Sequence, residues 1–580
     1  MVKQDAVMIP SLPYDEAAEP SLFAKFEPGT RTLPAGFQTT PQFQPLPVDI
    51  VFEKDVAVTM RDGVTIYVDV LRPAGTEKVP VVIAWSPYGK SGGTHPKNWN
   101  LFELLGVDQS RLSGLGKFEG PDPAYWVANG YAICNPDVRG VFNGEGDSTL
   151  TGKQEGEDEY DLIEWLAAQE WSNGKVGTCG NSYLAVSTWF AAAEQPPHLA
   201  AIAPWEGWND TYRDLAVRGG MPDPSFPEVL MVNYVGGGQR EDMVAEIEQY
   251  PLLGELWESK VAAVENITAP AYITASYSNL IHTLGTFRGW RRIRSADKWL
   301  RIHDGMEWPD FNTPENQDDL RRFFDHFLKG EDNGWEKTPA VRYSVMDLEG
   351  GDQTGLPATQ FPPTDFDIVK YYLDGSSHAL TPEQPATDLA TSYDSESVTD
   401  AATFTVTFDT ETQLVGYPKV RLFVESDGYD DMDVFVLLQK LDADGVVLEQ
   451  FNVPNHTEAM DNLTKAGAAI LKYKGSNGRL RASLRKLDDK WATDDVPSHS
   501  FDTVEKLEPG TPVALEIELF PVGLAFHPGE QLRLDISGFN RLGGVMPGRT
   551  TVIPDNHGRH IIHTGGSHAS YLQVPFKRVS

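Results

Sequence analysis

The chain has 580 residues, which is too long for one hydrophobic core and indicates two to four domains. Its 84 acidic and 48 basic residues give a formal net charge of −36, and such a surface repels nucleic-acid phosphates and anionic membranes. The two cysteines, Cys134 and Cys179, exclude a disulfide framework and favour a reducing compartment. Because neither an apolar signal segment nor a membrane-length apolar run is evident, we expect a cytoplasmic protein.

The first half of the chain predicts an α/β domain with an insertion. Residues 1–48 are rich in proline and polar residues, which indicates an extended arm lying over the body. Residues 49–205 and 266–338 alternate strands with helices, which is typical of a mostly parallel sheet. Residues 206–265 break this alternation with glycines and prolines, so we expect a cap over the carboxyl edge of the sheet.

The second half has a different character. Residues 339–580 contain short apolar stretches such as KVRLFVES and LRLDISG, separated by Gly, Asp, Asn and Pro. Strands at this spacing predict an antiparallel β-sandwich of the jelly-roll type.

A serine lies between a predicted strand and a predicted helix, in the segment Gly180-Asn181-Ser182-Tyr183-Leu184-Ala185. A glycine two residues before the serine suits a tight turn that lifts the hydroxyl into an active site. The amide of Tyr183 and the helix N-terminus would then face a developing oxyanion. Leu184 stands where G-x-S-x-G has its second glycine, so an ordinary strand–helix turn is the alternative.

The wider sequence favours the catalytic interpretation. The block EYDLIEWLAAQEWSNGKVGTCGNSYLAVSTW resembles the Xaa-Pro dipeptidyl-peptidase and cocaine esterase family of serine hydrolases, whose motif is G-x-S-Y-x-G. This chain departs from that motif only at Ala185. The segment SPYGK around Tyr88 is similar to the family's loop whose tyrosine completes the oxyanion hole. The segment DVRG from Asp137 and the C-terminal HIIHTGGSHASYLQVPF also resemble family segments.

The resemblance implies a fold and a set of site residues. The fold class is α/β: an α/β-hydrolase domain with an inserted helical cap, followed by a C-terminal jelly-roll-like β-sandwich. Ser182 would be the nucleophile, and the Tyr88 hydroxyl and the Tyr183 amide would hold the oxyanion. Together with the predicted tight turn at Ser182, the resemblance predicts a serine hydrolase that cleaves an ester or amide bond through a Ser182 acyl-enzyme.

The base and its orienting acid do not stand where the family has them. Near Ser278 the family has an aspartate, and at the position of Glu307 it has its histidine. Either His282 is the base, with Glu307 taking the role of the acid, or His303 is the base and pairs with Glu307 or another carboxylate. A rearranged or lost triad is the third alternative. Each pairing is chemically sound, because a triad is defined by geometry and not by chain order.

Residues after the predicted strand ends are candidates for the substrate pocket. Aromatic side chains would form its wall, and a carboxylate would bind an α-amine if the substrate carries one. We expect Trp85, Trp205, Trp208 and Tyr277 in the wall and Glu206 as the amine ligand. Alternatives to a plain esterase or amidase are an Xaa-Pro dipeptidyl-peptidase or amino-acid ester hydrolase, an acyltransferase or cyclase, and a non-catalytic binding protein.

No cofactor and no metal is expected. The histidines His557, His560 and His563 lie on one predicted strand, where simple alternation keeps them from sharing a face. The expected partner is a small ester or amide, or a short peptide, with no nucleic acid and no membrane. The sequence leaves open whether the protein forms a homo-oligomer.

Overall fold

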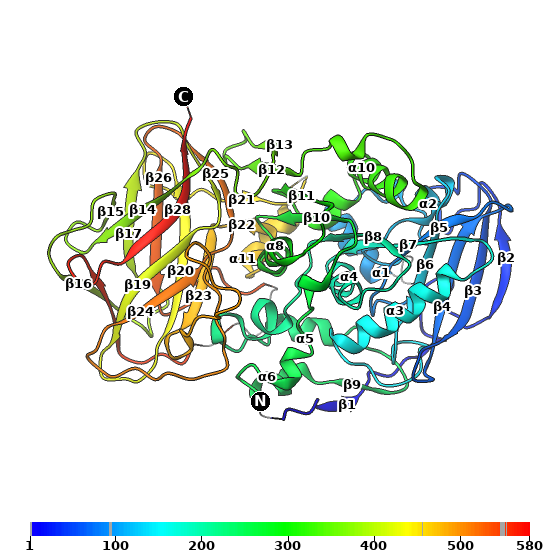
Figure 1. Cartoon of the computed structure of the whole chain (residues 1–580), viewed down its shortest axis with the longest axis horizontal. Helices are drawn as coiled ribbons and strands as arrows, with labels where there is room; N and C mark the ends of the chain where they lie inside the picture. Colours follow the sequence, from blue (N-terminus) through cyan, green and yellow to red (C-terminus); the bar gives the residue numbers. More distant parts are fainter. Residues whose placement is uncertain (1–2, 92–95, 455, 546–551, 553, 580) are drawn as a thin grey trace.

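The computed structural model describes residues 3–91, 96–454, 456–545, 552 and 554–579. Figure 1 shows two lobes side by side, a sheet flanked by helices on the right and a β-sandwich on the left. The lobe on the right carries the α/β core, and the N-terminal arm runs beneath it. These are the two architectures that the sequence predicts, an α/β-hydrolase fold and a C-terminal sandwich.

The sheet of the first lobe has a strand order that reverses in the middle. In spatial order its strands are β13 (Gln353–Ala358), β12 (Val341–Val345), β11 (Lys298–His303), β10 (Ala271–Ser276), β8 (Leu199–Trp205), β7 (Ser172–Asn181), β5 (Val79–Ile83), β6 (Ala132–Asp137), β4 (Thr65–Pro73), β3 (Ile50–Thr59) and β2 (Gly29–Leu33). The strands from β6 to β12 run parallel, and β2, β3 and β13 pair antiparallel at the edges. Because β6 and β7 lie on opposite sides of β5, a crevice opens there at the carboxyl edge.

The sheet extends further along the chain than the sequence indicates at both ends. Strand β2 comes from the predicted arm, and it pairs with β3. Strands β12 and β13 lie beyond residue 338, where the sandwich was expected to begin, yet β12 pairs with β11. The prediction placed this hairpin in the sandwich because its short strands and turn residues have the composition of that half.

Alternate residues of the central strands face two different cores. Val81 and Ile83 of β5 belong to the larger cluster, and Val82 belongs to the smaller one. The larger cluster includes side chains of α3 (Lys153–Ala167), α4 (Tyr183–Ala193) and α8 (Thr283–Arg292). The smaller cluster includes side chains of α2 (Pro123–Ala128) and α10 (Pro314–Phe324). The period of two along the strands therefore buries both faces of the sheet under helices.

The cap contains short helices and meets the N-terminal arm. Its elements are a π-helical turn (Thr211–Ala216), α5 (Ser225–Met231), β9 (Gln239–Glu241), α6 (Met243–Gln249) and α7 (Glu255–Glu258). Strand β1 (Met8–Pro10) of the arm pairs antiparallel with β9. Figure 1 shows this pair with α5 and α6 at the bottom of the first lobe. The arm is thus fixed on the cap by backbone hydrogen bonds.

The sandwich is built from strands of the second half of the chain. They are β14 (Asp367–Asp374), β15 (Ala379–Thr381), β16 (Leu389–Asp394), β17 (Ala402–Thr407), β18 (Thr412–Gly416), β19 (Lys419–Ser426), β20 (Asp433–Leu441), β23 (Ser476–Arg481), β24 (Val513–Glu518), β25 (Val522–Phe526), β26 (Gln531–Ser537), β27 (Arg559–Thr564) and β28 (Tyr571–Arg578). Most neighbours pair antiparallel, as predicted, while β15 and β17 meet in parallel.

A segment between β20 and β23 of the sandwich extends to the first lobe. It contains β21 (Gln450–Phe451), α11 (Glu458–Lys465) and β22 (Lys472–Tyr473). The carbonyl of Asn452 accepts a hydrogen bond of 2.6 Å from the amide of Met306, just before α9 (Glu307–Phe311). The two lobes therefore contact each other next to the carboxyl edge of the sheet.

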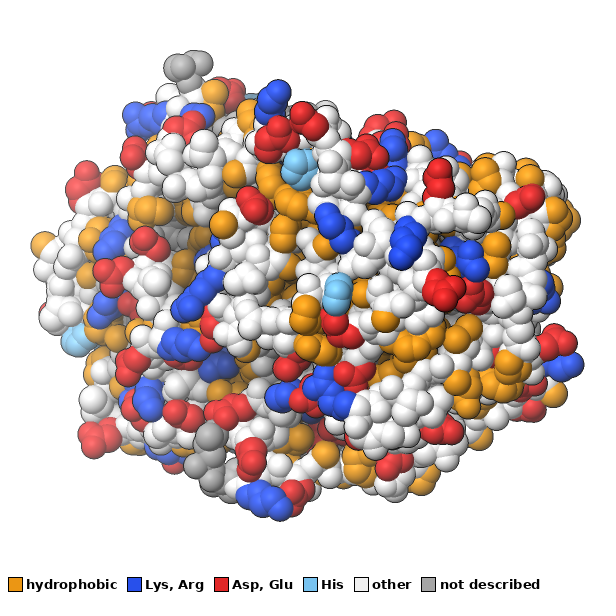
Figure 2. Space-filling view, turned by 45° about the vertical axis from the view of Figure 1, so that its right-hand side comes forward, with side chains coloured by type: hydrophobic (Ala, Val, Ile, Leu, Met, Phe, Trp, Pro, Cys, Tyr) orange, Lys and Arg blue, Asp and Glu red, His pale blue; other side chains and the backbone are white. Residues whose placement is uncertain are grey.

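Charged side chains cover the surface with both signs. Figure 2 shows acidic and basic side chains interspersed over one face, with apolar patches between them. Among the described residues, no helix combines the length and apolar character that crossing a membrane requires.

Candidate active site

Ser182 occupies a strained turn between β7 and α4. Its backbone has φ 54° and ψ −118°, a conformation that a residue with a side chain rarely adopts. The amide of Ser182 donates to the carbonyls of Glu206, at 3.1 Å, and Trp205, at 3.3 Å, which hold the turn against the end of β8. The turn therefore carries the hydroxyl at the N-terminus of α4, as the sequence predicts for a nucleophile elbow.

Two glycines make room for the residues that depart from the common elbow motifs. A Cβ atom on Gly180 would lie 2.5 Å from Cδ2 of Leu184, and a Cβ on Gly207 would lie 2.6 Å from Cβ of Ala185. Both distances are too short for real carbon atoms in contact. Leu184 and Ala185 are thus tolerated next to Ser182 because the chain has no side chain at these two facing positions.

His282 is the histidine that contacts Ser182. Its Nε2 lies 3.1 Å from Ser182 Oγ, and its ring stacks on Trp208 with 5.1 Å between centroids and 9° between planes. Burial lowers the pKa of His282 to about 3. The imidazole is therefore neutral at ordinary pH and is able to accept the serine proton.

Glu307 does not take the role expected of it. Within the described part of the chain, Nδ1 of His282 is buried and has no hydrogen-bond partner. Glu307 instead accepts from the side-chain amide of Asn279, whose same nitrogen donates to Glu206 at 2.9 Å. The Asn279 oxygen accepts from the backbone amide of His282 at 3.2 Å. Glu307 is thus linked through Asn279 to the backbone amide of His282, and it does not contact the imidazole ring.

His303 is occupied elsewhere, which corrects the second alternative. Its Nε2 lies 2.6 Å from Glu206 and 3.7 Å from Asp310. Although burial opposes protonation of His303, the carboxylates of Asp310 and Glu206 raise its pKa. Glu206 therefore forms an ion pair with His303 beneath the site, and this pairing also removes Glu206 from the amine-binding role that we expected.

The two candidate oxyanion donors lie beside Ser182 in different ways. Tyr88 lines the same cavity as Ser182, and burial raises the pKa of its hydroxyl well above 10, so it remains a donor. The Tyr183 hydroxyl points away, 2.9 Å from Glu155 and 2.6 Å from the Tyr234 hydroxyl. Of the two polar groups of Tyr183, the backbone amide, at the first residue of α4, is the one that is left to bind the oxyanion.

The sequence interpretation missed a buried carboxyl at this place, Glu119. It lines the cavity with Ser182 and Tyr88, and its Oε1 accepts a hydrogen bond of 2.8 Å from the indole of Trp308. Its loop has no periodic pattern that would place the side chain. The only available signal is a single acid between Phe118 and Gly120, in a stretch that precedes α2.

A cavity of about 330 Å³ opens above the serine. Four parts of the chain build its wall: the N-terminal arm, the cap, the loops at the carboxyl edge of the sheet and the segment of the sandwich lobe that contains Ile470. Apolar side chains dominate it, and they include Phe226, Leu230, Val235, Ile281 and Ile470. Such a lining is typical of a site for a small, mostly apolar ligand.

The aromatic residues expected in the wall do not line this cavity. All four are buried in packing roles. Trp205 packs edge-on against Phe311, the indole of Trp85 donates to Glu155, Trp208 supports His282, and Tyr277 stacks on Phe287. The prediction was wrong because a strand end also contributes to the core, and residue type alone does not separate the two.

Models of known protein families match both halves of the chain. The X-Pro dipeptidyl-peptidase (S15 family) model matches residues 62–233, and the model of the X-Pro dipeptidyl-peptidase C-terminal non-catalytic domain matches residues 333–573. A crystal structure of a CocE/NonD family hydrolase from Staphylococcus aureus is 34% identical, with a TM-score of 0.83, and the match covers 91% of this chain and 94% of that one. The chain belongs to the CocE/NonD family of hydrolases.

Two further relatives widen this picture. The cocaine esterase of a Rhodococcus strain is 27% identical over 56% of this chain, and the match spans 63% of that esterase, less than two thirds of its length. The Xaa-Pro dipeptidyl-peptidase of Lacticaseibacillus casei is 23% identical over 74% of this chain and 61% of that enzyme. This member of the CocE/NonD family thus resembles both esterases and peptidases.

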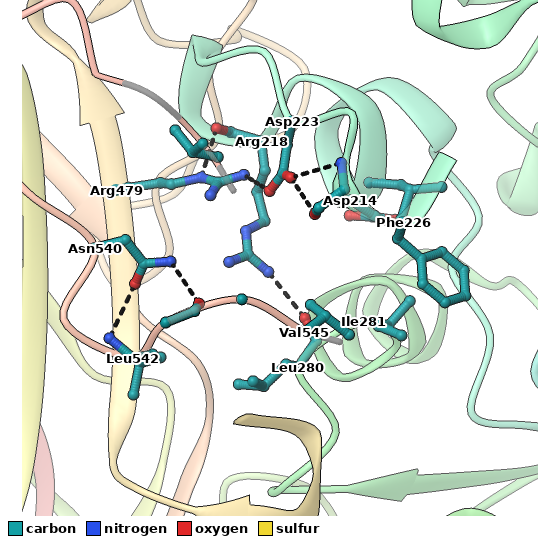
Figure 3. Close-up of a pocket in the computed structure, with 15 residues that line it drawn as sticks. Asp214, Arg218, Asp223, Phe226, Leu280, Ile281, Arg479, Asn540, Leu542 and Val545 are labelled. Carbon is teal, nitrogen blue, oxygen red and sulfur yellow. Dashed lines mark hydrogen bonds and ion pairs between the residues drawn. The ribbon is translucent and has the colours of Figure 1, made fainter. Parts of the chain in front are cut away.

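The CocE/NonD hydrolase has a second, smaller cavity between its cap and its sandwich. Figure 3 shows the guanidinium of Arg218 in this cavity, where it donates to the carbonyl of Leu280 at 2.9 Å, while Arg479 donates to Asp223 at 2.8 Å. Its volume is about 40 Å³, which is room for water and not for an acyl substrate. Phe226 and Ile281 line both cavities and so form the partition between them.

Two family segments of this CocE/NonD hydrolase have structural roles. Asp137 pairs with Lys90, which also contacts Asp55 at 3.1 Å. Arg139 binds Asp158 through two hydrogen bonds of 2.6 Å. Within the described residues, no group of three or more His, Cys, Asp or Glu side chains is arranged to hold a metal ion.

Proposed function

We propose that the protein hydrolyses uncharged carboxylic esters through a Ser182 acyl-enzyme, with His282 as the base. The observation that carries the proposal is the hydrogen bond of 3.1 Å between Ser182 Oγ and His282 Nε2 at the wall of a cavity of about 330 Å³. A neutral imidazole within hydrogen-bond distance activates a serine hydroxyl for attack on an acyl carbon.

The reaction begins at the hydrogen bond between His282 Nε2 and Ser182 Oγ. His282 Nε2 accepts the proton while Ser182 Oγ attacks the carbonyl carbon, and the carbonyl oxygen becomes an oxyanion. The Tyr88 hydroxyl and the Tyr183 amide donate hydrogen bonds to it. The intermediate then collapses, the alcohol leaves with the proton from Nε2, and water hydrolyses the acyl-enzyme by the same route.

Trp208 supports the base in place of a carboxylate. In most such enzymes an acid on Nδ1 fixes the ring and stabilises the imidazolium. Here the indole face stacks on the ring at 5.1 Å, which fixes the plane of the ring. An aromatic face also attracts a cation, by about 0.5–2 kcal/mol. The indole thereby favours the imidazolium that forms when His282 takes the serine proton.

The state of the nearby carboxyls supports an uncharged substrate. An α-amine needs an ionised carboxylate that is free to bind it, but Glu206, Asp210 and Asp214 are paired with His303, Arg213 and Arg288. Burial and the adjacent carboxylate of Glu206 raise the pKa of Glu307 well above its usual range, so this cavity residue is neutral. A cationic substrate would therefore meet no free counter-charge among these groups.

The test is intact-mass labelling with a fluorophosphonate, in wild type and in S182A, H282A and H303A. We expect one adduct on the wild type, none on S182A, and labelling slowed at least about 100-fold in H282A, since a general base contributes about 10²–10⁴-fold. H303A should still label, because His303 contacts Glu206 and not Ser182. No adduct on the wild type, or loss in H303A with retention in H282A, would contradict the proposal.

A comparison of substrates tests the charge preference. The panel consists of p-nitrophenyl butyrate, an alanine p-nitrophenyl ester and an alanyl-proline p-nitroanilide. We expect kcat/KM for the butyrate to exceed that of both amine-bearing substrates. A preference of more than tenfold for either amine-bearing substrate would overturn the substrate class while leaving the acyl-enzyme chemistry intact.

A further inference from the structure

Glu119 is a buried carboxyl in the active site that no step above uses. Its side chain lines the cavity with Ser182, and the residue is only 3% exposed. Oε1 accepts from the indole of Trp308 at 2.8 Å. Oε2 is buried and has no hydrogen-bond partner within the described residues. A buried oxygen without a partner destabilises the folded protein, so its position calls for a functional reason.

The backbone fixes this carboxyl against the nucleophile turn. The carbonyl of Glu119 accepts a hydrogen bond of 3.1 Å from the amide of Asn181, the residue directly before Ser182. Glu119 has φ 69°, in the left-handed region that residues with side chains avoid. Gly120 follows, where a Cβ would lie 2.9 Å from Cβ of Ala84. Strain held in place by close packing is characteristic of residues aimed at a functional site.

The groups around the carboxyl are those of the oxyanion site. Ser182 and Tyr88 line the same cavity as this carboxyl, and their hydroxyls and the Tyr183 amide lower its pKa. We propose that Glu119 is a catalytic residue of the oxyanion site, whose carboxyl donates a hydrogen bond from Oε2 to the oxyanion beside Tyr88 and the Tyr183 amide. This inference rests on the proposed acyl-enzyme mechanism. No bond to Glu119 forms or breaks, and its proton stays on Oε2.

The protonation state supports this role. Burial raises the pKa of Glu119 to about 8, although the hydrogen bond from Trp308 and the nearby Tyr88 hydroxyl act in the opposite direction. The other titratable groups that face it are Tyr88, whose hydroxyl stays protonated, and Glu307, which is neutral as described. A carboxylic acid that apolar surroundings keep neutral is able to donate a hydrogen bond to a developing charge.

The protonation state of Glu119 determines how the rate depends on pH. Below pH 8 Glu119 is protonated and donates to the oxyanion. Above pH 8 it becomes a carboxylate, which donates nothing and repels the oxyanion. We therefore expect kcat for p-nitrophenyl butyrate to fall as pH rises through 8. A serine hydrolase without such a group keeps its rate there, because its base stays neutral.

The experiment compares kcat from pH 5 to 10 in wild type, E119Q and E119A. Glutamine keeps a neutral donor at every pH, so E119Q should retain kcat within about threefold at pH 6 and lose the decline above pH 8. Alanine has no donor, so E119A should lose about 100-fold at pH 6, the typical effect of one oxyanion donor. E155Q is the matched control, because Glu155 is also buried and also accepts from an indole, that of Trp85, at 2.9 Å. E155Q should keep the decline.

The outcomes separate the two proposals. A decline above pH 8 that persists in E119Q, or an unchanged kcat in E119A at pH 6, would overturn the role of Glu119 while the acyl-enzyme stands. A wild type that neither labels with fluorophosphonate nor hydrolyses the ester would overturn the mechanism itself. If E119A fails to fold, as judged by thermal unfolding, the pH profile of E119Q still decides the question.

Discussion

His282 determines the acid limit of the reaction. Burial lowers its pKa to about 3, and only the neutral imidazole accepts the serine proton. We predict that kcat/KM has no inflection near pH 6.5, the ordinary value for histidine, and that its acid limb lies below pH 5. The measurement is kcat/KM for p-nitrophenyl butyrate between pH 4 and 7.5. An inflection between pH 6 and 7 would show that the ring is more solvated than its packing against Trp208 indicates.

For single residues, the sequence predicts the roles of side chains that stand in a recognisable motif. It misses the roles of side chains that only tertiary contacts bring to the site. Ser182 and Tyr88 stand in motifs of fixed spacing, and His282 was one of two candidate bases. The choice of His282 over His303 depends on the fold, because α8 brings the first to Ser182 while the second meets Glu206. No motif marks Glu119, which reaches the site from an irregular loop.

The turn from β7 to α4 depends on the lack of a side chain at Gly207. We predict that G207A destabilises the protein by about 1–3 kcal/mol, because its Cβ would lie 2.6 Å from Cβ of Ala185 and 2.7 Å from the amide of Val186. Urea unfolding of wild type, G207A, A185G and the double variant measures this. A185G alone should cost about 1 kcal/mol, the usual effect of glycine inside a helix.

The double variant is the internal control for this clash. Removing Cβ of Ala185 relieves the contact with that atom but not with the Val186 amide. The double variant should therefore lose less stability than the sum of the two single variants. Additive losses would mean that the two positions do not press on each other.

At the scale of elements, periodicity predicts strands better than it predicts their partners. The alternation of strands and helices correctly predicts the parallel sheet, because the helices between the strands cover both of its faces. Composition alone placed residues 339–358 in the sandwich, yet β12 continues the first sheet beside β11. Pairing with a neighbouring strand is a long-range contact, and the composition of a strand does not identify its partner.

The lobes of the whole molecule are joined by buried ion pairs next to the base. Arg288 lies on α8, six residues after His282, and binds both Asp214 of the cap and Glu518 of the sandwich. Arg291 of the same helix also binds Glu518, at 3.1 Å. Breaking a buried pair by removing one partner typically costs about 3–5 kcal/mol, because the other charge stays buried. The sandwich thereby holds the helix that carries the base.

We predict that E518Q uncouples the two lobes. Scanning calorimetry of the wild type should give one transition, because the lobes share this cluster, and E518Q should give two, with the less stable lobe unfolding first. The pKa of Glu518 is lowered by Arg288 and Arg291 although burial opposes this, so its contribution is present above pH 4.5 and is lost as pH falls through its lower folded value. The single transition of the wild type should therefore split at acid pH as it does in E518Q. A single transition in E518Q at neutral pH would show that apolar contacts alone, such as that of Tyr277 with Gly523, are enough to couple the lobes.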